Sequence, residues 1–271
     1  MRFAGLVAIC LVFSGPFATA SAQSGSEGGP PPFPDFSFRR VVVPDAGYSG
    51  PRIDIQIGAQ QAAAPSVPDA PLAPLTTAWF WDQVPSGRED GAGRFMAAIR
   101  LLETAPEAAS LQIAAAETLL ALSDAHDLDI LRATLGTRVS PALVLAVMAV
   151  ESRGDRAAES RAGAQGLMQL VPATAERFGV DDSFDPAQNI AGGVAYLDWL
   201  MEEFDRDPVL TLAGYNAGEG AVEAAGGVPD FPETRDYVVK VLATWRAARL
   251  LCVTPPELVS DGCVLRSMLD G

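Results

Sequence analysis

The sequence predicts an all-α domain that follows a long proline- and glycine-rich segment, and three observations support this. From Gly91 to Leu251 apolar residues recur at helical spacing, and strand-like alternation is absent. Residues 141–150 are apolar on every face, which is typical of a helix buried in a core. Residues 23–78 contain ten prolines, a composition typical of a disordered linker.

The N-terminal segment, residues 1–22, has the features of a secretory signal peptide. Arg2 supplies the positive start, Leu6–Phe17 the apolar run, and residues 18–22 two small-residue cleavage sites. No later apolar run approaches the length that spans a membrane. We therefore expect a protein with no integral membrane segment after cleavage, located in the periplasm or secreted.

Charge and cysteine usage exclude several classes of function. The chain has 34 acidic and 19 basic residues, a formal net charge of −15, and no long basic stretch, which disfavours nucleic acid and anionic membrane surfaces as partners. After signal cleavage, Cys252 and Cys263 remain; in an oxidising compartment we expect a disulfide, with two free thiols as the alternative. The only histidine is His126 and no ligand-spaced cluster exists, so the sequence predicts no metal site. We also expect no cofactor, and we expect the protein to be a monomer.

The linker contains two strand-like segments, residues 39–43 and 52–57, for which transient order or docking to a partner is as compatible with the sequence as a stable fold. It ends at Trp79-Phe80-Trp81. We expect this aromatic trio to anchor the linker to a core, and stacking on sugar rings is the alternative.

Residues 79–136 are predicted to form a helical extension. One helix is marked by Phe95 to Leu102, a second by Leu111 to Leu122, and a short third covers Asp127–Leu135, with His126 in the connection.

Residues 137–250 are predicted to form the main helical domain, followed by a tail at 251–271. Ser140-Pro141, Asp185-Pro186 and Asp207-Pro208 are helix-start signals. Further helices are expected from Pro172 and from Pro232, and Gly218 is expected to end the helix that begins at Pro208.

Glu151 follows the apolar helix directly. Burial and the negative end of the helix dipole both disfavour its charged form and raise its pKa. A general acid that works near neutral pH needs such a raised pKa. The simpler alternative is that Glu151 is the first solvated residue after a core helix.

Four motifs occur in order between Thr137 and Ala248. They are Glu151-Ser152, Gly163–Leu170, Ala213–Val222 and Pro232–Val238, with Asp185-Pro186 and Asn189-Ile190 between the second and the third. This set resembles the soluble lytic transglycosylase (SLT) domain family, whose fold is all-helical and similar to goose-type lysozyme. One motif would be weak support, but four in the right order are specific.

The resemblance implies an enzyme, a carbon–oxygen lyase that acts on peptidoglycan glycan strands. It would cleave the β-1,4 bond between N-acetylmuramic acid and N-acetylglucosamine without water and leave 1,6-anhydro ends. Glu151 matches the catalytic acid and base of the family. Matching or adjacent positions with expected roles in substrate binding or site bracing are Ser152, Ser160, Met168, Gln169, Tyr215, Asn216, Glu233 and Tyr237.

Some of these roles have alternatives. Met168 can instead fill the core, and Glu233 can instead pair with Arg235. Tyr215 and Asn216 are expected to bond Glu151 or the N-acetyl group and to brace the site. Gly214 departs from the alanine of many relatives, and a helical glycine costs about 1 kcal/mol relative to alanine.

Three other functions compete with this interpretation. A hydrolytic lysozyme of the same fold would need a second carboxylate to activate water, for which Asp155, Glu159 and Glu219 are candidates. A non-catalytic wall-binding component of a wall-spanning secretion apparatus, reached through the linker, would not need a desolvated acid. A generic helical interaction domain does not explain the polar groups of the motifs.

Overall fold

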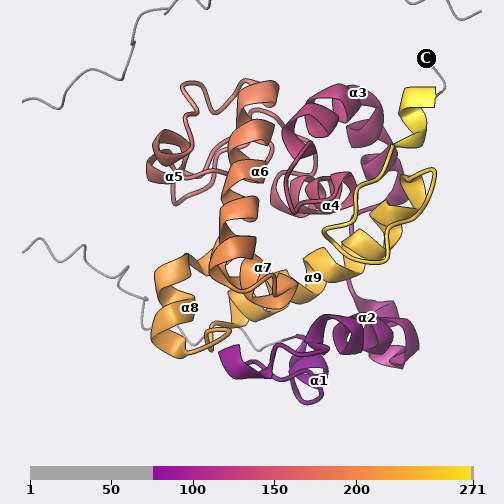
Figure 1. Ribbon diagram of the computed structural model, residues 1–271, viewed down its shortest axis with the longest axis vertical. Helices are drawn as coiled ribbons and strands as arrows, with labels where there is room; N and C mark the ends of the chain where they lie inside the picture. The colour runs from indigo at the N-terminus through magenta and orange to yellow at the C-terminus, as the bar shows by residue number, and fades with distance from the viewer. Residues whose placement is uncertain (1–75, 270–271) are drawn as a thin grey trace, which may run out of the picture. The chain divides into compact units, whose positions relative to one another are not determined.

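The computed structural model describes residues 76–269, and the regular structure within this range is helical (Figure 1). The described residues contain no β-strand, only four isolated bridges. The predicted all-α class is therefore confirmed. The predicted signal peptide, almost all of the linker and the strand-like segments at 39–43 and 52–57 lie outside the described residues.

Five of the nine α-helices in the described residues begin at a proline, and three of these five also have a capping side chain. Ser140, Asp185 and Asp207 accept backbone amide bonds at the starts of α4, α6 and α7. The α-helices are α1 (Ala78–Trp81), α2 (Arg94–Thr104), α3 (Ala116–Thr134), α4 (Pro141–Glu151), α5 (Pro172–Arg177), α6 (Pro186–Glu203), α7 (Pro208–Ala217), α8 (Glu219–Ala225) and α9 (Pro232–Ala248). Short 3-10 helices occupy Arg88–Asp90, Pro106–Ser110, Arg249–Leu251 and Arg266–Leu269.

The predicted break at His126 is wrong, because α3 is one continuous helix from Ala116 to Thr134. No glycine or proline occurs between these residues, so nothing in the chain interrupts the backbone hydrogen bonds. The start was also misplaced, since residues 111–115 lie outside the helix. Residues 112–115 line the candidate active site described below.

α4 is the centre of the core and packs against α3 and α9 (Figure 1). All residues from Pro141 to Ala149 are buried. Phe80 is fully buried in the same core, and Trp79 and Trp81 pack against it. The prediction that the aromatic trio anchors the chain to a core is confirmed.

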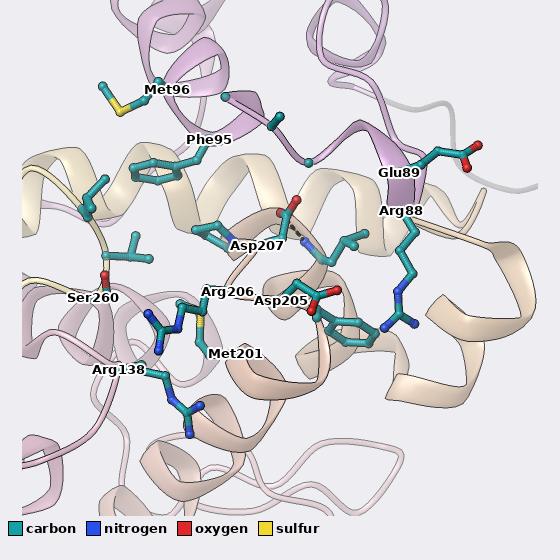
Figure 2. Close-up of a pocket in the computed structure, with 18 residues that line it drawn as sticks. Arg88, Glu89, Phe95, Met96, Arg138, Met201, Asp205, Arg206, Asp207 and Ser260 are labelled. Carbon is teal, nitrogen blue, oxygen red and sulfur yellow. Dashed lines mark hydrogen bonds between the residues drawn. The ribbon is translucent and has the colours of Figure 1, made fainter.

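A buried ion pair joins the helical extension to α7. Nε of Arg94, at the start of α2, donates to Oδ2 of Asp207 at 3.0 Å, and the Arg94 side chain is fully buried. The other carboxylate oxygen of Asp207 accepts the amides of Val209 and Leu210 at 2.9 and 3.2 Å. Figure 2 shows Asp207 at this position, in a pocket between α2 and the α6–α7 turn. Removing one partner of such a pair costs about 3–5 kcal/mol, so it firmly fixes the extension.

The C-terminal segment closes over the start of α4. Cys252 and Cys263 form the predicted disulfide, with their Cα atoms 5.6 Å apart. Within the enclosed loop, the carbonyl of Val259 accepts the amide of Ser140 at 2.8 Å. The loop therefore binds the residue that caps α4.

Among residues 76–269, no helix is long and apolar enough to cross a membrane.

Candidate active site

Glu151 is the last residue of α4 and is partly buried. Its Oε1 accepts a hydrogen bond of 2.7 Å from the hydroxyl of Tyr237 on α9. Burial is the largest influence and raises the pKa of Glu151, the bond from Tyr237 lowers it, and the charge of Glu233 raises it again, to about 7. The carboxyl can therefore hold and release a proton near neutral pH.

Two pockets meet at Glu151. The first, which we call the extension lobe, has a volume of about 530 Å³, and the second, the loop lobe, about 440 Å³. Glu151, Asn216 and Glu233 line both, so the two lobes form one groove with the carboxyl at its middle. Pockets of this size are typical of ligand sites.

The segment after α4 supplies the loop lobe. Ser160 lines this lobe, and its Oγ accepts the amide of Ala164 at 3.0 Å. Gln169 also lines it, in a left-handed backbone conformation with φ of 50°, and its side-chain amide donates to the carbonyls of Ala158 and Gly166 at 3.1 and 2.9 Å. The Gln169 amide nitrogen thus holds the loop, and its oxygen is the atom left for a ligand.

Two predicted groove residues have structural positions instead. Met168 is fully buried and does not line the groove, because its side chain packs against Gly193 of α6, where an added Cβ would lie 2.4 Å from the sulfur. Ser152 is buried; its hydroxyl donates to the carbonyl of Met148 and accepts the amide of Gly154. Ser152 therefore braces the end of α4, and neither residue lines the two lobes.

The two predicted tyrosines divide their roles differently from expectation. The Tyr215 hydroxyl donates to the carbonyl of Met168 at 2.8 Å, whereas the expected bond to Glu151 comes from Tyr237. Burial raises the pKa of Tyr215 well above its usual value, and the charge of Glu151 raises it further. Tyr215 is thus a neutral brace under the loop.

Polar contacts fix the first turn of α9. Oδ1 of Asn216 accepts the hydroxyl of Thr234 at 2.7 Å. Glu233 is exposed on the groove, whereas Arg235 pairs with Asp230 and lies over the ring of Trp81. The alternative in which Glu233 pairs with Arg235 is therefore wrong.

From the sequence, Asn189 had no assigned site role, and Glu219 was only a candidate carboxylate for activating water. Asn189 is fully buried; its Oδ1 accepts the amide of Met168 at 2.7 Å and its Nδ2 donates to the carbonyl of Gln165. The signal available in the sequence was an amide side chain on a face of α6 that is otherwise apolar. Asn189 ties the loop of the groove to α6.

Glu219 lies in the loop lobe and is held there by two side chains. It accepts hydrogen bonds from Arg177 at 2.7 Å and Tyr196 at 2.9 Å. Burial acts to raise the pKa of Glu219, but its backbone amide, Arg177 and Tyr196 together lower it below its usual value. Asp155 and Glu159 do not line either lobe.

No group of three or more histidine, cysteine, aspartate or glutamate side chains within residues 76–269 could hold a metal ion. The pocket of Figure 2, about 480 Å³, contains none of the predicted site residues.

This chain is similar to known proteins over the segment that contains Glu151, Asn216 and Glu233. Residues 130–238 match the family described as "Transglycosylase SLT domain". The chain is 47% identical over 89 residues to membrane-bound lytic murein transglycosylase F of Desulfosudis oleivorans, which covers 31% of this chain and 20% of that protein. It is 40% identical over 96 residues to the transglycosylase of enterobacteria phage PRD1, covering 35% of each.

A third relative is the soluble lytic murein transglycosylase of Escherichia coli K12, 31% identical over 152 residues, covering 48% of this chain and 24% of that protein. The crystal structure of the 70 kDa soluble lytic transglycosylase from Escherichia coli aligns at 24% identity and a TM-score of 0.43, covering 69% of this chain and 31% of that one. The chain thus spans between about a fifth and a third of the length of these curated relatives. The resemblance inferred from the four motifs is confirmed, because residues 130–238 match the transglycosylase SLT domain family.

Proposed function

We propose that this chain is an exported peptidoglycan lytic transglycosylase that acts in the cell-wall compartment. It cleaves the β-1,4 bond between N-acetylmuramic acid and N-acetylglucosamine and leaves 1,6-anhydro-N-acetylmuramic acid ends. The observation that carries the proposal is a carboxyl with a pKa of about 7, held by Tyr237 at the middle of a groove. The family match and the names of the relatives support the substrate class.

In the proposed reaction Glu151 acts twice. The protonated carboxyl gives its proton to the glycosidic oxygen as the bond to the anomeric carbon breaks. The C6 hydroxyl of the same muramoyl residue then bonds to the anomeric carbon, and the Glu151 carboxylate takes the hydroxyl proton. The proton count balances, the acid is regenerated, and neither water nor a second carboxylate is consumed.

The neighbouring residues support these steps. Tyr237 occupies Oε1, which leaves Oε2 to carry the proton toward the substrate. Burial is the main cause of the raised pKa of Glu151, and the charge of Glu233, which is exposed on the groove, raises this pKa further. Ser160, Gln169 and Asn216 present polar atoms to the sugar ring and its N-acetyl group.

Mass spectrometry of purified peptidoglycan digested by the mature chain tests this proposal, with Glu151→Gln in parallel. We expect fragments with 1,6-anhydro ends, absent with the variant. Reducing ends would contradict the proposal and establish hydrolysis. Glu219 would then be the first residue to replace, because it alone of the three candidate water-activating carboxylates lies in the groove. Sedimentation with peptidoglycan but no cleavage would favour a binding component instead.

A further inference from the structure

The extension lobe is lined by two cationic side chains, although the protein as a whole is strongly acidic. Lys240, the only lysine of a chain with a net charge of −15, lines it together with Arg153. Within residues 76–269 no salt bridge involves either side chain. The carboxyl groups that line the lobe are Glu151 and Glu233. While Glu151 is protonated, the lobe therefore carries a net positive charge.

The pocket of Figure 2 provides the contrast. It contains three arginines, and two of them are neutralised by carboxylates of the protein. Arg138 pairs with Asp198 at 2.9 Å and Glu202 at 3.0 Å, and Arg88 pairs with Glu203 at 3.9 Å. Two of the three arginines of that pocket thus have carboxylate partners, whereas neither cation that lines the extension lobe forms a salt bridge within residues 76–269.

The position of Lys240 follows from the periodicity of α9. Glu233, Tyr237 and Lys240 are separated by four and three residues, a spacing that places them on one face of a helix. Tyr237 contacts Glu151, so Lys240 lies about one turn further along the same face. All three line the extension lobe.

The outer wall of the lobe comes from Gln112–Ala115 and Thr118. This segment precedes the family match, which begins at residue 130. Ile113 is 43% exposed and supplies apolar surface to the lobe. The wall therefore lies outside the segment that matches the family.

We propose that the extension lobe is a carboxylate subsite in which Lys240, with Arg153 beside it, binds the acidic substituent of the muramoyl residue next to the scissile bond. The inference rests on the proposed function. A muramoyl residue carries a lactyl ether whose carboxylate is either free or joined to a stem peptide that has carboxylates of its own. Both sources present the same group to an ammonium ion.

Isothermal titration calorimetry with full-length mature Glu151→Gln tests this subsite, because glutamine keeps the site neutral and prevents turnover. Three tetrasaccharides of alternating N-acetylglucosamine and N-acetylmuramic acid are compared: one with free lactyl carboxylates, one with these carboxylates converted to methylamides, and one with stem peptides. We expect at least one carboxylate-bearing glycan to bind about fivefold more tightly than the methylamide.

Adding Lys240→Gln should abolish this preference, whereas Lys240→Arg should retain it. Arg100→Gln is the matched control: it removes one positive charge from an exposed position of α2 that does not line the groove. A preference that Lys240→Gln removes only for the free lactyl form, or only for the peptide form, identifies the source of the carboxylate.

A preference that is absent, or that persists in Lys240→Gln, overturns the subsite. If the methylamide glycan still binds in that case, the proposed function stands and the subsite alone is wrong. If no glycan binds and the unsubstituted chain releases no fragments from peptidoglycan, the proposed function fails and the subsite fails with it.

Discussion

The two helices that meet at Glu151 are held in place by different forces. α4 is buried along Pro141–Ala149, so apolar packing is the main force that sets its position. The first turn of α9 is instead held by side-chain bonds, from Thr234 to Asn216 and from Thr76 and Thr77 to Asp236. Burial thus places the carboxyl and raises its pKa, while directional bonds select the side chain that faces it.

The largest expected effect is the loss of activity in Glu151→Gln. Removal of the proton donor should lower kcat by about 10³-fold, within the usual range for a general acid. Release of anhydro-muropeptides is the measurement, with Glu176→Gln, an exposed carboxyl outside the groove, as control. Activity within tenfold of the unsubstituted chain would mean that another group donates the proton.

A cavity created in α4 tests whether apolar packing holds this helix in place. Leu145→Ala removes a fully buried side chain and should lower the free energy of unfolding by about 3 kcal/mol. Leu135→Ala, at a position that is 69% exposed, should change it by less than about 0.5 kcal/mol. Urea unfolding of both variants is the measurement, and equal losses would show that α4 is not positioned by its core.

The raised pKa of Glu151 also has a consequence for stability. Its pKa is about 7 in the folded chain against 4.5 for the free side chain, so folding favours the protonated form. The contribution of Glu151 to the free energy of unfolding is therefore highest below about pH 4.5 and falls as the pH rises through about 7. Glu151→Gln should gain on the order of 2 kcal/mol at pH 8, discounted for partial exposure, and nothing at pH 4. Melting temperatures at both pH values test this; a variant less stable at pH 8 would contradict the burial of the charge.

Tyr237→Phe tests the role of the hydrogen bond that Tyr237 donates to Glu151. The Tyr237 bond lowers the pKa of Glu151, so its loss should raise that pKa further. Since the acid must be protonated, activity falls as the pH rises through about 7, and this midpoint should move upward by about one pH unit. Tyr215→Phe is the control, because its hydroxyl bonds Met168. A shift in the control but not in Tyr237→Phe would reverse the assignment of the two tyrosines.

The smallest effect is expected at Asp236, which precedes Tyr237 and accepts Thr76 and Thr77 at 2.8 and 2.7 Å. Asp236→Asn replaces one acceptor by a donor and should cost about 1 kcal/mol of stability. It should also lower kcat by about threefold, because Tyr237 lies on the same turn. Asp129→Asn, on α3 outside the groove, is the control. Unchanged stability and activity would mean that the bonds from Thr76 and Thr77 to Asp236 do not help to position Tyr237.

Local sequence signals were sufficient for much of this architecture. Capping residues and prolines marked the starts of α4, α6 and α7 because these act within a few residues of the chain. The uniform apolarity of α4 predicted its burial, and it predicted the raised pKa of Glu151 because Glu151 directly follows the apolar residues in the chain. The disulfide followed from an even cysteine count.

The errors concern relations between distant segments. Met168 and Gln169 are adjacent, yet the first lies under α6 and the second in the groove. Which of Tyr215 and Tyr237 reaches Glu151 depends on how α4, α7 and α9 cross, which no helical periodicity encodes. Residues 112–115 were predicted as helix, and only their place beside α9 makes them a wall of the groove. The starts of α4, α6 and α7, the buried acid and the disulfide could thus be predicted from the chain, whereas each partner of that acid was determined by packing between helices.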